Sequence, residues 1–271
     1  MIIDFHTHCF PDGLASRAMA ALECGDLRAH HNGTIDGLNR SRQEADIDLV
    51  VIQPVATKPS QVRSINQWAQ RIQGPGVLAF AAFHPQLSDW EAALDEITAY
   101  GFQGIKLHPD YQGFFVDDDL YFPLYEAIFQ RDLILTFHAG VDACLPPPYH
   151  CTPTRLRRVI DHFPTGKIVA AHFGGFQQWE EARVHLFGRD IYLDTSYTLP
   201  FLSPQKVREM IYSHRVDRIL FGTDSPWTCQ TQALKLMERL ALPPEDQAQI
   251  MGWNAYRLLK LKEEEHARTS P

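Results

Sequence analysis

Short apolar runs recur along the chain and alternate with amphipathic stretches. The runs are rich in β-branched residues and lie near residues 2–6, 48–54, 77–83, 103–107, 133–138, 167–172, 190–195 and 217–223. Amphipathic stretches that predict helices lie at 61–72, 89–99, 120–130, 154–163, 179–186 and 204–213, and after the last run at 234–240, 245–250 and 254–261. A strand followed by a helix, repeated about every 25 to 35 residues, is typical of parallel βα units.

The apolar runs have almost no polar positions, which is the pattern of strands that are covered on both faces. A barrel surrounded by helices satisfies this pattern, and so does an open doubly wound sheet. No Gly-x-Gly-x-x-Gly turn follows the first run, so a dinucleotide-binding open sheet is disfavoured. The eight runs in 271 residues therefore predict an α/β fold, a (β/α)8 TIM barrel, as one domain over residues 1–271.

Two connections between the predicted elements are unusually long. Residues 10–39 follow the first strand and residues 139–153 follow the fifth, and both are expected to be extended loops near the barrel mouth. Loops of this length in compact domains usually carry function. Helices are expected after the eighth strand, followed by a charged, frayed tail over residues 262–271.

The first strand ends in two histidines, His6 and His8, that are separated by one residue. Side chains at i and i+2 leave the same face of a strand, about 6.6 Å apart. Two neutral imidazoles in this arrangement can reach one cation at the roughly 2.0–2.1 Å that is usual for zinc. The pair therefore predicts a metal site at the end of the first strand.

Three further apolar runs end in a polar side chain that binds metals, namely His138, His172 and Asp224. A single histidine on an apolar strand is more often a core residue than a ligand. In a (β/α)8 barrel, however, the carboxyl ends of all strands meet at one face. We therefore expect these side chains to converge with His6 and His8 around a catalytic divalent metal.

Composition and charge exclude several functional classes. The net charge of −8 and the dispersed basic residues argue against a nucleic-acid partner, which usually needs a clustered basic face. No apolar stretch approaches the roughly 20 residues that span a bilayer, so no membrane partner is expected. Five cysteines without a Cys-x-x-Cys spacing suggest free thiols in a reducing compartment, and the expected location is cytoplasmic.

Six motifs in this order resemble the amidohydrolase superfamily, and in particular its amidohydrolase-related (type 2) branch, which includes enzymes similar to aminocarboxymuconate semialdehyde decarboxylase. The resemblance covers residues 1 to about 261. The motifs are Asp-Phe-His-Thr-His at 4–8, Gly-Ile-Lys-Leu-His-Pro at 104–109, Phe-His-Ala-Gly at 137–140, His-Phe-Gly-Gly at 172–175, Gly-Thr-Asp-Ser-Pro at 222–226 and Asn-Ala-Tyr-Arg-Leu-Leu at 254–259.

The resemblance implies one divalent metal ion, most often zinc, held by His6, His8, His138 and Asp224. It places His172 outside the ligand set, in contact with the metal-bound water or the substrate. A divalent metal lowers the pKa of its water toward about 7, and a neighbouring carboxylate or imidazole can move the proton. We therefore assign proton transfer jointly to Asp224 and His172.

Candidate substrate-binding residues are less well defined. Two-metal members of the superfamily use a carboxylated lysine on the fourth strand, where this chain has Lys106. The type 2 branch usually carries one metal, which favours binding of a substrate anion by Lys106 or His108; a lysine that only neutralises carboxylates is an equal alternative. Arg40 and Arg42 are candidates for holding a substrate carboxylate. Aromatic residues that follow strand ends are expected to line the pocket: Phe10, Tyr111, Tyr197 and Trp227.

Three functions remain open at this point. The leading hypothesis is a metal-dependent hydrolase in which metal-bound hydroxide attacks a small, anionic amide, ester or lactone. The alternative is a nonoxidative metal-dependent decarboxylase of an aromatic or unsaturated carboxylic acid, and a minor alternative is a catalytically silent metal-binding barrel. The expected partner is a small-molecule substrate, and the sequence leaves homo-oligomer formation open.

Overall fold

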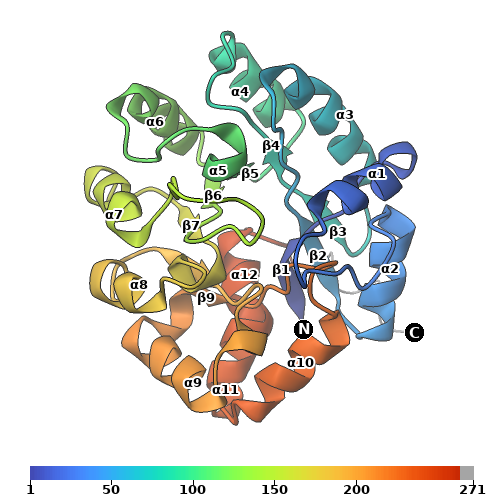
Figure 1. Cartoon of the computed structure of the whole chain (residues 1–271), viewed down its shortest axis with the longest axis vertical. Helices are drawn as coiled ribbons and strands as arrows, with labels where there is room; N and C mark the ends of the chain where they lie inside the picture. The colour runs from blue at the N-terminus through green and yellow to red at the C-terminus, as the bar shows by residue number, and fades with distance from the viewer. Residues whose placement is uncertain (263–271) are drawn as a thin grey trace.

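Parallel strands form a ring at the centre of the molecule, and helices surround the ring (Figure 1). The computed structural model describes residues 1–262. The strands are β1 (Ile3–Thr7), β2 (Leu49–Ile52), β3 (Val77–Ala79), β4 (Ala81–Ala82), β5 (Gly104–Leu107), β6 (Ile134–Phe137), β7 (Ile168–Ala170), β8 (Tyr192–Asp194) and β9 (Ile219–Leu220). Each predicted run overlaps a strand, and the third contains both β3 and β4.

The strands follow one another around the ring in sequence order, β1 to β3 and then β4 to β9. Phe80 separates β3 from β4, so these two pieces belong to one interrupted strand. The ring closes between its first and last strands, because the Phe5 amide donates to the Phe221 carbonyl over 2.9 Å and the Asp224 amide donates to the His6 carbonyl over 2.8 Å. The prediction of a (β/α)8 barrel is confirmed.

Helices surround the barrel, and most of them connect consecutive strands (Figure 1). They are α1 (Asp12–Leu22), α2 (Ile35–Glu44), α3 (Val62–Ile72), α4 (Trp90–Ala99), α5 (Pro109–Gln112), α6 (Phe122–Gln130), α7 (Pro153–His162), α8 (Trp179–His185), α9 (Pro204–Ser213), α10 (Gln230–Arg239), α11 (Pro244–Ala248) and α12 (Asn254–Leu258). A π-helical turn, Gln249–Trp253, joins α11 to α12.

The connection after β1 differs from the expected irregular loop, because it contains α1 and the beginning of α2. Helix α1 buries Ala15 and Met19, which are four residues apart and so lie on one helical face. Helix α2 begins at a cap, where the Thr34 hydroxyl accepts a hydrogen bond from the Gly37 amide over 3.0 Å. The predicted frayed tail lies outside the described residues from residue 263 onward.

The barrel interior is filled by apolar side chains at the end opposite the candidate site. Ile3 and Phe5 of β1 pack there with Val51 of β2, and Leu258 and Leu259 at the end of α12 belong to the same cluster. Strand β1 has an irregular register between Asp4 and Thr7. Bulges of this kind re-aim side chains near functional sites. Phe5 packs in the core, and His6 lines the cavity at the carboxyl ends of the strands.

Within residues 1–262, the structure has no helix that is both long and apolar enough to cross a membrane.

Candidate metal centre

His6, His8 and Asp224 meet at the carboxyl ends of β1 and β9. One potential ligand atom of each lies within 4.8 Å of the others. Nε2 of His8 is 3.0 Å and Nε2 of His6 is 3.5 Å from Oδ1 of Asp224. Asp224 has a left-handed backbone with φ 65°, a strained conformation that non-glycine residues often adopt at functional sites. Two imidazoles and a carboxylate in this geometry form a donor set suited to a divalent metal.

The protonation of His6 is fixed by its neighbours. Its Nδ1 lies 2.8 Å from Oδ2 of Asp194 and its Nε2 lies 3.0 Å from Nζ of Lys106. A carboxylate only accepts hydrogen bonds and an ammonium only donates them, so the proton of His6 is on Nδ1 and Nε2 carries the lone pair. Burial, and after it the charge of Lys106, lowers the pKa of His6 to about 4.

Asp194 and Ser196 support this arrangement from the end of β8. The Ser196 hydroxyl donates to Oδ1 of Asp194, and the backbone amide of His172 donates to the same oxygen over 3.0 Å. Burial opposes ionisation of Asp194, but its interaction with His6 and the hydrogen bond from Ser196 hold its pKa below the usual range. Asp194 is therefore a carboxylate that orients a candidate metal ligand, a common arrangement around zinc.

A second hydrogen-bonded chain fixes the protonation of His138. Nδ1 of His172 lies 3.0 Å from the Ser196 carbonyl oxygen, which can only accept, so His172 carries its proton on Nδ1. Nε2 of His172 then accepts, and the group 3.0 Å away is Nδ1 of His138. His138 therefore donates through Nδ1 and has its lone pair on Nε2.

Nε2 of His138 is buried and has no hydrogen-bond partner. Buried polar atoms are normally paired, so such an atom calls for a ligand. The neutral imidazole nitrogen with a free lone pair is the form that binds metals. The residues of the candidate site thus fit a divalent metal, with His138 supplying one nitrogen beside the group of His6, His8 and Asp224.

The structure also places His138 in a second group, with His108 and Asp142, whose ligand atoms lie within 4.8 Å of one another. The rings of His108 and His138 stack, with centroids 4.0 Å apart. Nδ1 of His108 accepts from the Tyr111 amide over 3.4 Å, so the proton of neutral His108 is on Nε2. With its proton on Nε2, His108 acts in this group as a hydrogen-bond donor toward Asp142.

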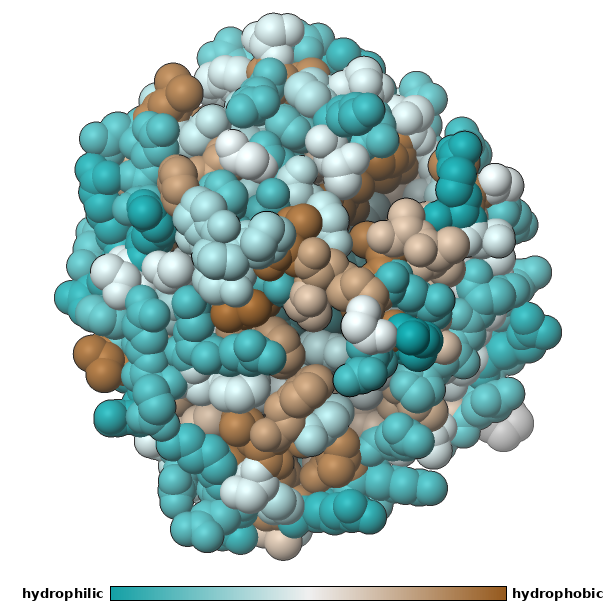
Figure 2. Space-filling model, viewed as in Figure 1, coloured by the Kyte–Doolittle hydropathy of each residue, from teal (hydrophilic) through white to brown (hydrophobic). Residues whose placement is uncertain are grey.

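A cavity of about 210 Å³ opens above these residues. Figure 2 shows apolar side chains gathered around the hollow at the centre of this face. Lys106 and His108 line the cavity beside the histidines of the site. Aromatic side chains form much of the remaining wall, and these are Phe10, Trp68, Tyr111, Phe176, Tyr197 and Trp227. Among the described residues, no arginine lines the cavity.

The structure does not place Arg40 and Arg42 at the cavity, which corrects their expected position. Both lie on α2, and a guanidinium nitrogen of Arg42 donates to the Ile47 carbonyl over 3.2 Å, just before β2. Helices in βα units run back toward the amino ends of the strands, so the second half of α2 points away from the barrel mouth.

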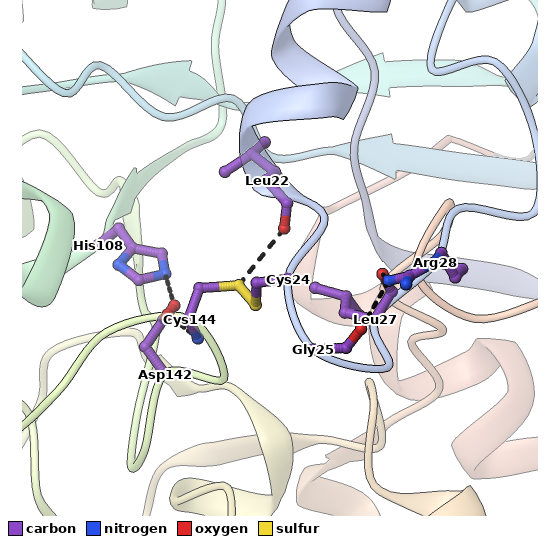
Figure 3. Close-up of a disulfide and its surroundings, with 8 residues drawn as sticks. All are labelled: Leu22, Cys24, Gly25, Leu27, Arg28, His108, Asp142 and Cys144. Carbon is purple, nitrogen blue, oxygen red and sulfur yellow. Dashed lines mark hydrogen bonds and ion pairs between the residues drawn. A yellow bond between two sulfur atoms is a disulfide. The ribbon is translucent and has the colours of Figure 1, made fainter.

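A disulfide between Cys24 and Cys144 corrects the expectation of free thiols. It joins the segment after α1 to the segment after β6 at the edge of the cavity, and Cys144 is one of the lining residues (Figure 3). Cysteines 9, 151 and 229 are free. Burial raises the pKa of Cys9 to about 12, which makes it a poor nucleophile.

Asp142, Asp194 and Ser196 are site residues that the sequence reasoning missed. Asp194 ends an apolar run, which is the same signal that pointed to His138 and Asp224. The role of Asp142 had no such signal, because it lies in the irregular connection after β6.

Comparisons with known proteins identify the family of the chain. A family model described as amidohydrolase matches residues 3–261. No curated protein sequence matches the chain.

Several solved structures share the fold at low identity. A dihydroxybenzoic acid decarboxylase from Polaromonas sp. JS666, with bound manganese and the inhibitor 2-nitroresorcinol, is 20% identical, with a TM-score of 0.76 and coverage of 98% of both chains. A 2,6-dihydroxybenzoate decarboxylase in complex with 2,6-dihydroxybenzoate is 20% identical, with a TM-score of 0.74 and coverage of 96% of this chain and 99% of that one.

A probable 2-pyrone-4,6-dicarboxylic acid hydrolase from Acinetobacter baumannii, with citric acid bound, is 15% identical. Its TM-score is 0.66, and the match covers 96% of this chain and 99% of that one. At these identities the likeness establishes the fold, and the family model extends over nearly the whole described chain. The chain therefore belongs to the amidohydrolase superfamily, in its type 2 branch.

Proposed function

We propose that this protein is a metal-dependent hydrolase that cleaves a small ester, lactone or amide built on a single ring. The observation that carries the proposal is the convergence of His6, His8 and Asp224 on one point of the cavity, next to the unpaired Nε2 of His138. These four residues would hold one divalent ion. Such an ion, when bound, lowers the pKa of water and polarises a carbonyl group.

Asp224 is the proposed proton carrier of the reaction. Burial opposes its ionisation, but the hydrogen bond with His8 and the nearby histidines hold its pKa below the usual range, so it is a carboxylate at neutral pH. Its oxygen can take the proton of the attacking water and return it to the leaving group. The bond that forms joins the water oxygen to the carbonyl carbon, and the bond that breaks is the ester or amide bond.

His172 is the proposed positioning residue, because both of its ring nitrogens have partners in the protein. Nδ1 donates to Ser196 and Nε2 accepts from His138. This differs from the expected shared role of His172 in proton transfer. Lys106 lies beside His6 at the base of the cavity, where its charge can stabilise the negative charge that develops on the carbonyl oxygen.

The size and walls of the cavity support a single-ring substrate. An apolar cavity of about 150 Å³ holds one benzene molecule, and this cavity measures about 210 Å³. A ring with one or two small substituents therefore fits between the aromatic walls. Stacking and apolar contacts favour a planar ring in such a site.

A nonoxidative decarboxylase is the second candidate, because the same apolar walls would desolvate a substrate carboxylate. The decarboxylases with this fold carry single-ring ligands in two of the structures described above. Against it, the described residues that line the cavity provide no guanidinium group to hold a carboxylate in a bidentate pair. The hydrolase is therefore preferred.

A product assay with the zinc-loaded enzyme separates the two candidates. We expect phenyl acetate, dihydrocoumarin or benzamide to be hydrolysed with release of acid or ammonia, and we expect no carbon dioxide from 2,6-dihydroxybenzoate. Asp224→Asn should reduce the hydrolysis rate by a factor of about 10² to 10⁴ while the melting temperature changes little. Release of carbon dioxide without any hydrolysis would select the decarboxylase instead.

A further inference from the structure

Asp142 presents a buried carboxylate in the wall of the cavity. It lies in the connection between β6 and α7 and is 8% exposed. Its Oδ1 accepts from the Cys144 amide over 2.8 Å, and its Oδ2 lies 3.4 Å from Nε2 of His108. Figure 3 shows the carboxylate turned toward the His108 ring, beside the disulfide.

Asp142 has fewer hydrogen bonds than a structural buried carboxylate in the same chain. Asp4 accepts from the Thr223 amide over 2.9 Å, from the Thr223 hydroxyl over 2.6 Å and from Gln230 over 2.7 Å. A carboxylate has about four acceptor positions, and a buried charge requires partners for them. Asp142 has two such partners in the described chain, the Cys144 amide and, at 3.4 Å, Nε2 of His108. Oδ2 of Asp142 therefore retains acceptor capacity at the cavity.

The charges around the cavity disfavour an anion at this position. The carboxylates of Asp142 and Asp224 both line it, whereas Lys106 contacts His6 at the base. Among the described lining residues, no arginine balances Asp142. A ligand hydroxyl or amino group can supply the missing hydrogen bond, whereas a ligand carboxylate there would meet a like charge.

We propose that Asp142 and His108 form a recognition site for a hydrogen-bond donor, a hydroxyl or amino substituent on the substrate ring. The inference rests on the proposed function only in taking the cavity as the substrate site. It replaces the expected anionic substrate with a neutral, donor-bearing one. Asp142 is in this account a specificity-determining residue.

A disulfide, hydrogen bonds and ring stacking hold Asp142 and His108 in position in the absence of a ligand. The disulfide of Cys144 with Cys24 anchors the segment two residues beyond Asp142, and the Cys144 amide is the donor to Oδ1. His108 is held by the Tyr111 amide and by its stacking on His138. A preorganised pair loses little entropy on binding, which favours discrimination between similar ligands.

Binding of unreactive probes to the full chain tests the proposal separately from any catalytic activity. Calorimetry or ligand-observed NMR would compare phenol, anisole and benzoate on the metal-free and on the zinc-loaded protein. We expect phenol to bind at least about tenfold more tightly than anisole in both forms, because a hydrogen bond to a charged group is lost in the ether. Equal affinities for phenol and anisole would overturn the proposal.

Two substitutions of Asp142 sharpen the test. Asp142→Leu removes the acceptor, so phenol and anisole should bind with similar affinity. Asp142→Asn removes the charge, so benzoate should bind about tenfold more tightly than it binds the wild type. Asp110→Asn is the matched control, because Asp110 pairs with His150 and does not line the cavity; it should leave all three affinities unchanged.

Thermal melting verifies the fold of each variant. If Asp142→Leu does not fold, two other measurements still test the recognition site. They are the ratio of phenol to anisole affinity in the wild type and the benzoate affinity of Asp142→Asn. An unchanged benzoate affinity in Asp142→Asn would contradict the proposed recognition site. Because the probes do not react, their affinities test the recognition site independently of whether the protein hydrolyses esters.

Discussion

Nδ1 of His138 lies 3.0 Å from Nε2 of His172, whose own Nδ1 lies 3.0 Å from the Ser196 carbonyl. His138 donates through Nδ1 to His172, and His172 donates through Nδ1 to the Ser196 carbonyl. The lone pair of His138 is therefore on Nε2. Asp194 fixes the lone pair of His6 in the same way. Two candidate metal ligands, on β1 and at the end of β6, are thus oriented by residues that do not themselves belong to the ligand set.

Replacement of His172 should weaken metal binding. His172→Ala removes the acceptor of the His138 proton, so His138 can rotate or change tautomer, and zinc affinity should fall about 10- to 100-fold. Competition with a fluorescent chelator measures this affinity directly. His185→Ala on α8 is the control and should bind zinc like the wild type; an unchanged affinity in His172→Ala would contradict the orienting role.

Asp194→Asn should disturb the site through His6. An asparagine amide can donate to Nδ1 of His6 and so favour the tautomer with the proton on Nε2, the nitrogen that faces the candidate metal position. We expect zinc affinity to fall at least about tenfold, with a corresponding loss of activity that excess zinc partly restores. NMR of ring nitrogens in the metal-free variant would show the changed His6 tautomer, and an unaltered tautomer would argue against this role.

The sequence predicted the strands well because parallel strands that are buried on both faces are almost entirely apolar. The same signal located residues 138, 172 and 224, since each ends such a strand. The same signal applies to Asp194, which follows the apolar residues Ile191 to Leu193. The irregular register of β1 was not predictable from alternation.

Positions outside the strands were predicted less well. Helix direction, rather than distance along the sequence, determines that Arg40 and Arg42 lie away from the barrel mouth. The pairing of Cys24 with Cys144 connects residues 120 positions apart. Asp142 lies on a connection whose conformation follows from these tertiary contacts, so periodicity could not place it.

Loss of the disulfide should destabilise the protein and loosen the cavity wall. Cys144→Ser should lower the free energy of unfolding by about 2–4 kcal/mol, since the cross-link restricts the unfolded chain. Urea unfolding under non-reducing conditions measures the difference. Cys229→Ser, at a free cysteine, is the control; equal stability of Cys144→Ser and this control would count against the cross-link.

The stability of the metal-free protein should decrease as the pH falls below about 6.5. Burial lowers the pKa of several histidines, to about 4 for His6, His31 and His214. It also lowers the pKa of His84, His108 and His138. Between pH 6.5 and 4 the unfolded chain therefore binds more protons than the folded one at these histidines. Each additional bound proton lowers the free energy of unfolding by about 1.4 kcal/mol per pH unit.

Two carboxylates act in the opposite direction. Burial raises the pKa of Asp4 to about 7 and also raises the pKa of Asp110, so both stabilise the fold at low pH, and Asp4 loses that contribution as the pH rises through 7. The histidines outnumber them, and a net decrease is expected. Urea unfolding of the chelator-treated protein at several pH values from 7.5 to 4.5 measures the slope, and a constant or rising stability would contradict the assignment.

Zinc stoichiometry tests the central claim most directly. The wild-type protein, equilibrated with zinc and dialysed, should contain about one bound ion per chain by elemental analysis, because one set of residues converges on one point. The double variant His6→Ala, His8→Ala should bind almost none while it retains its circular dichroism spectrum. Equal zinc content in the wild type and a folded double variant would contradict the account.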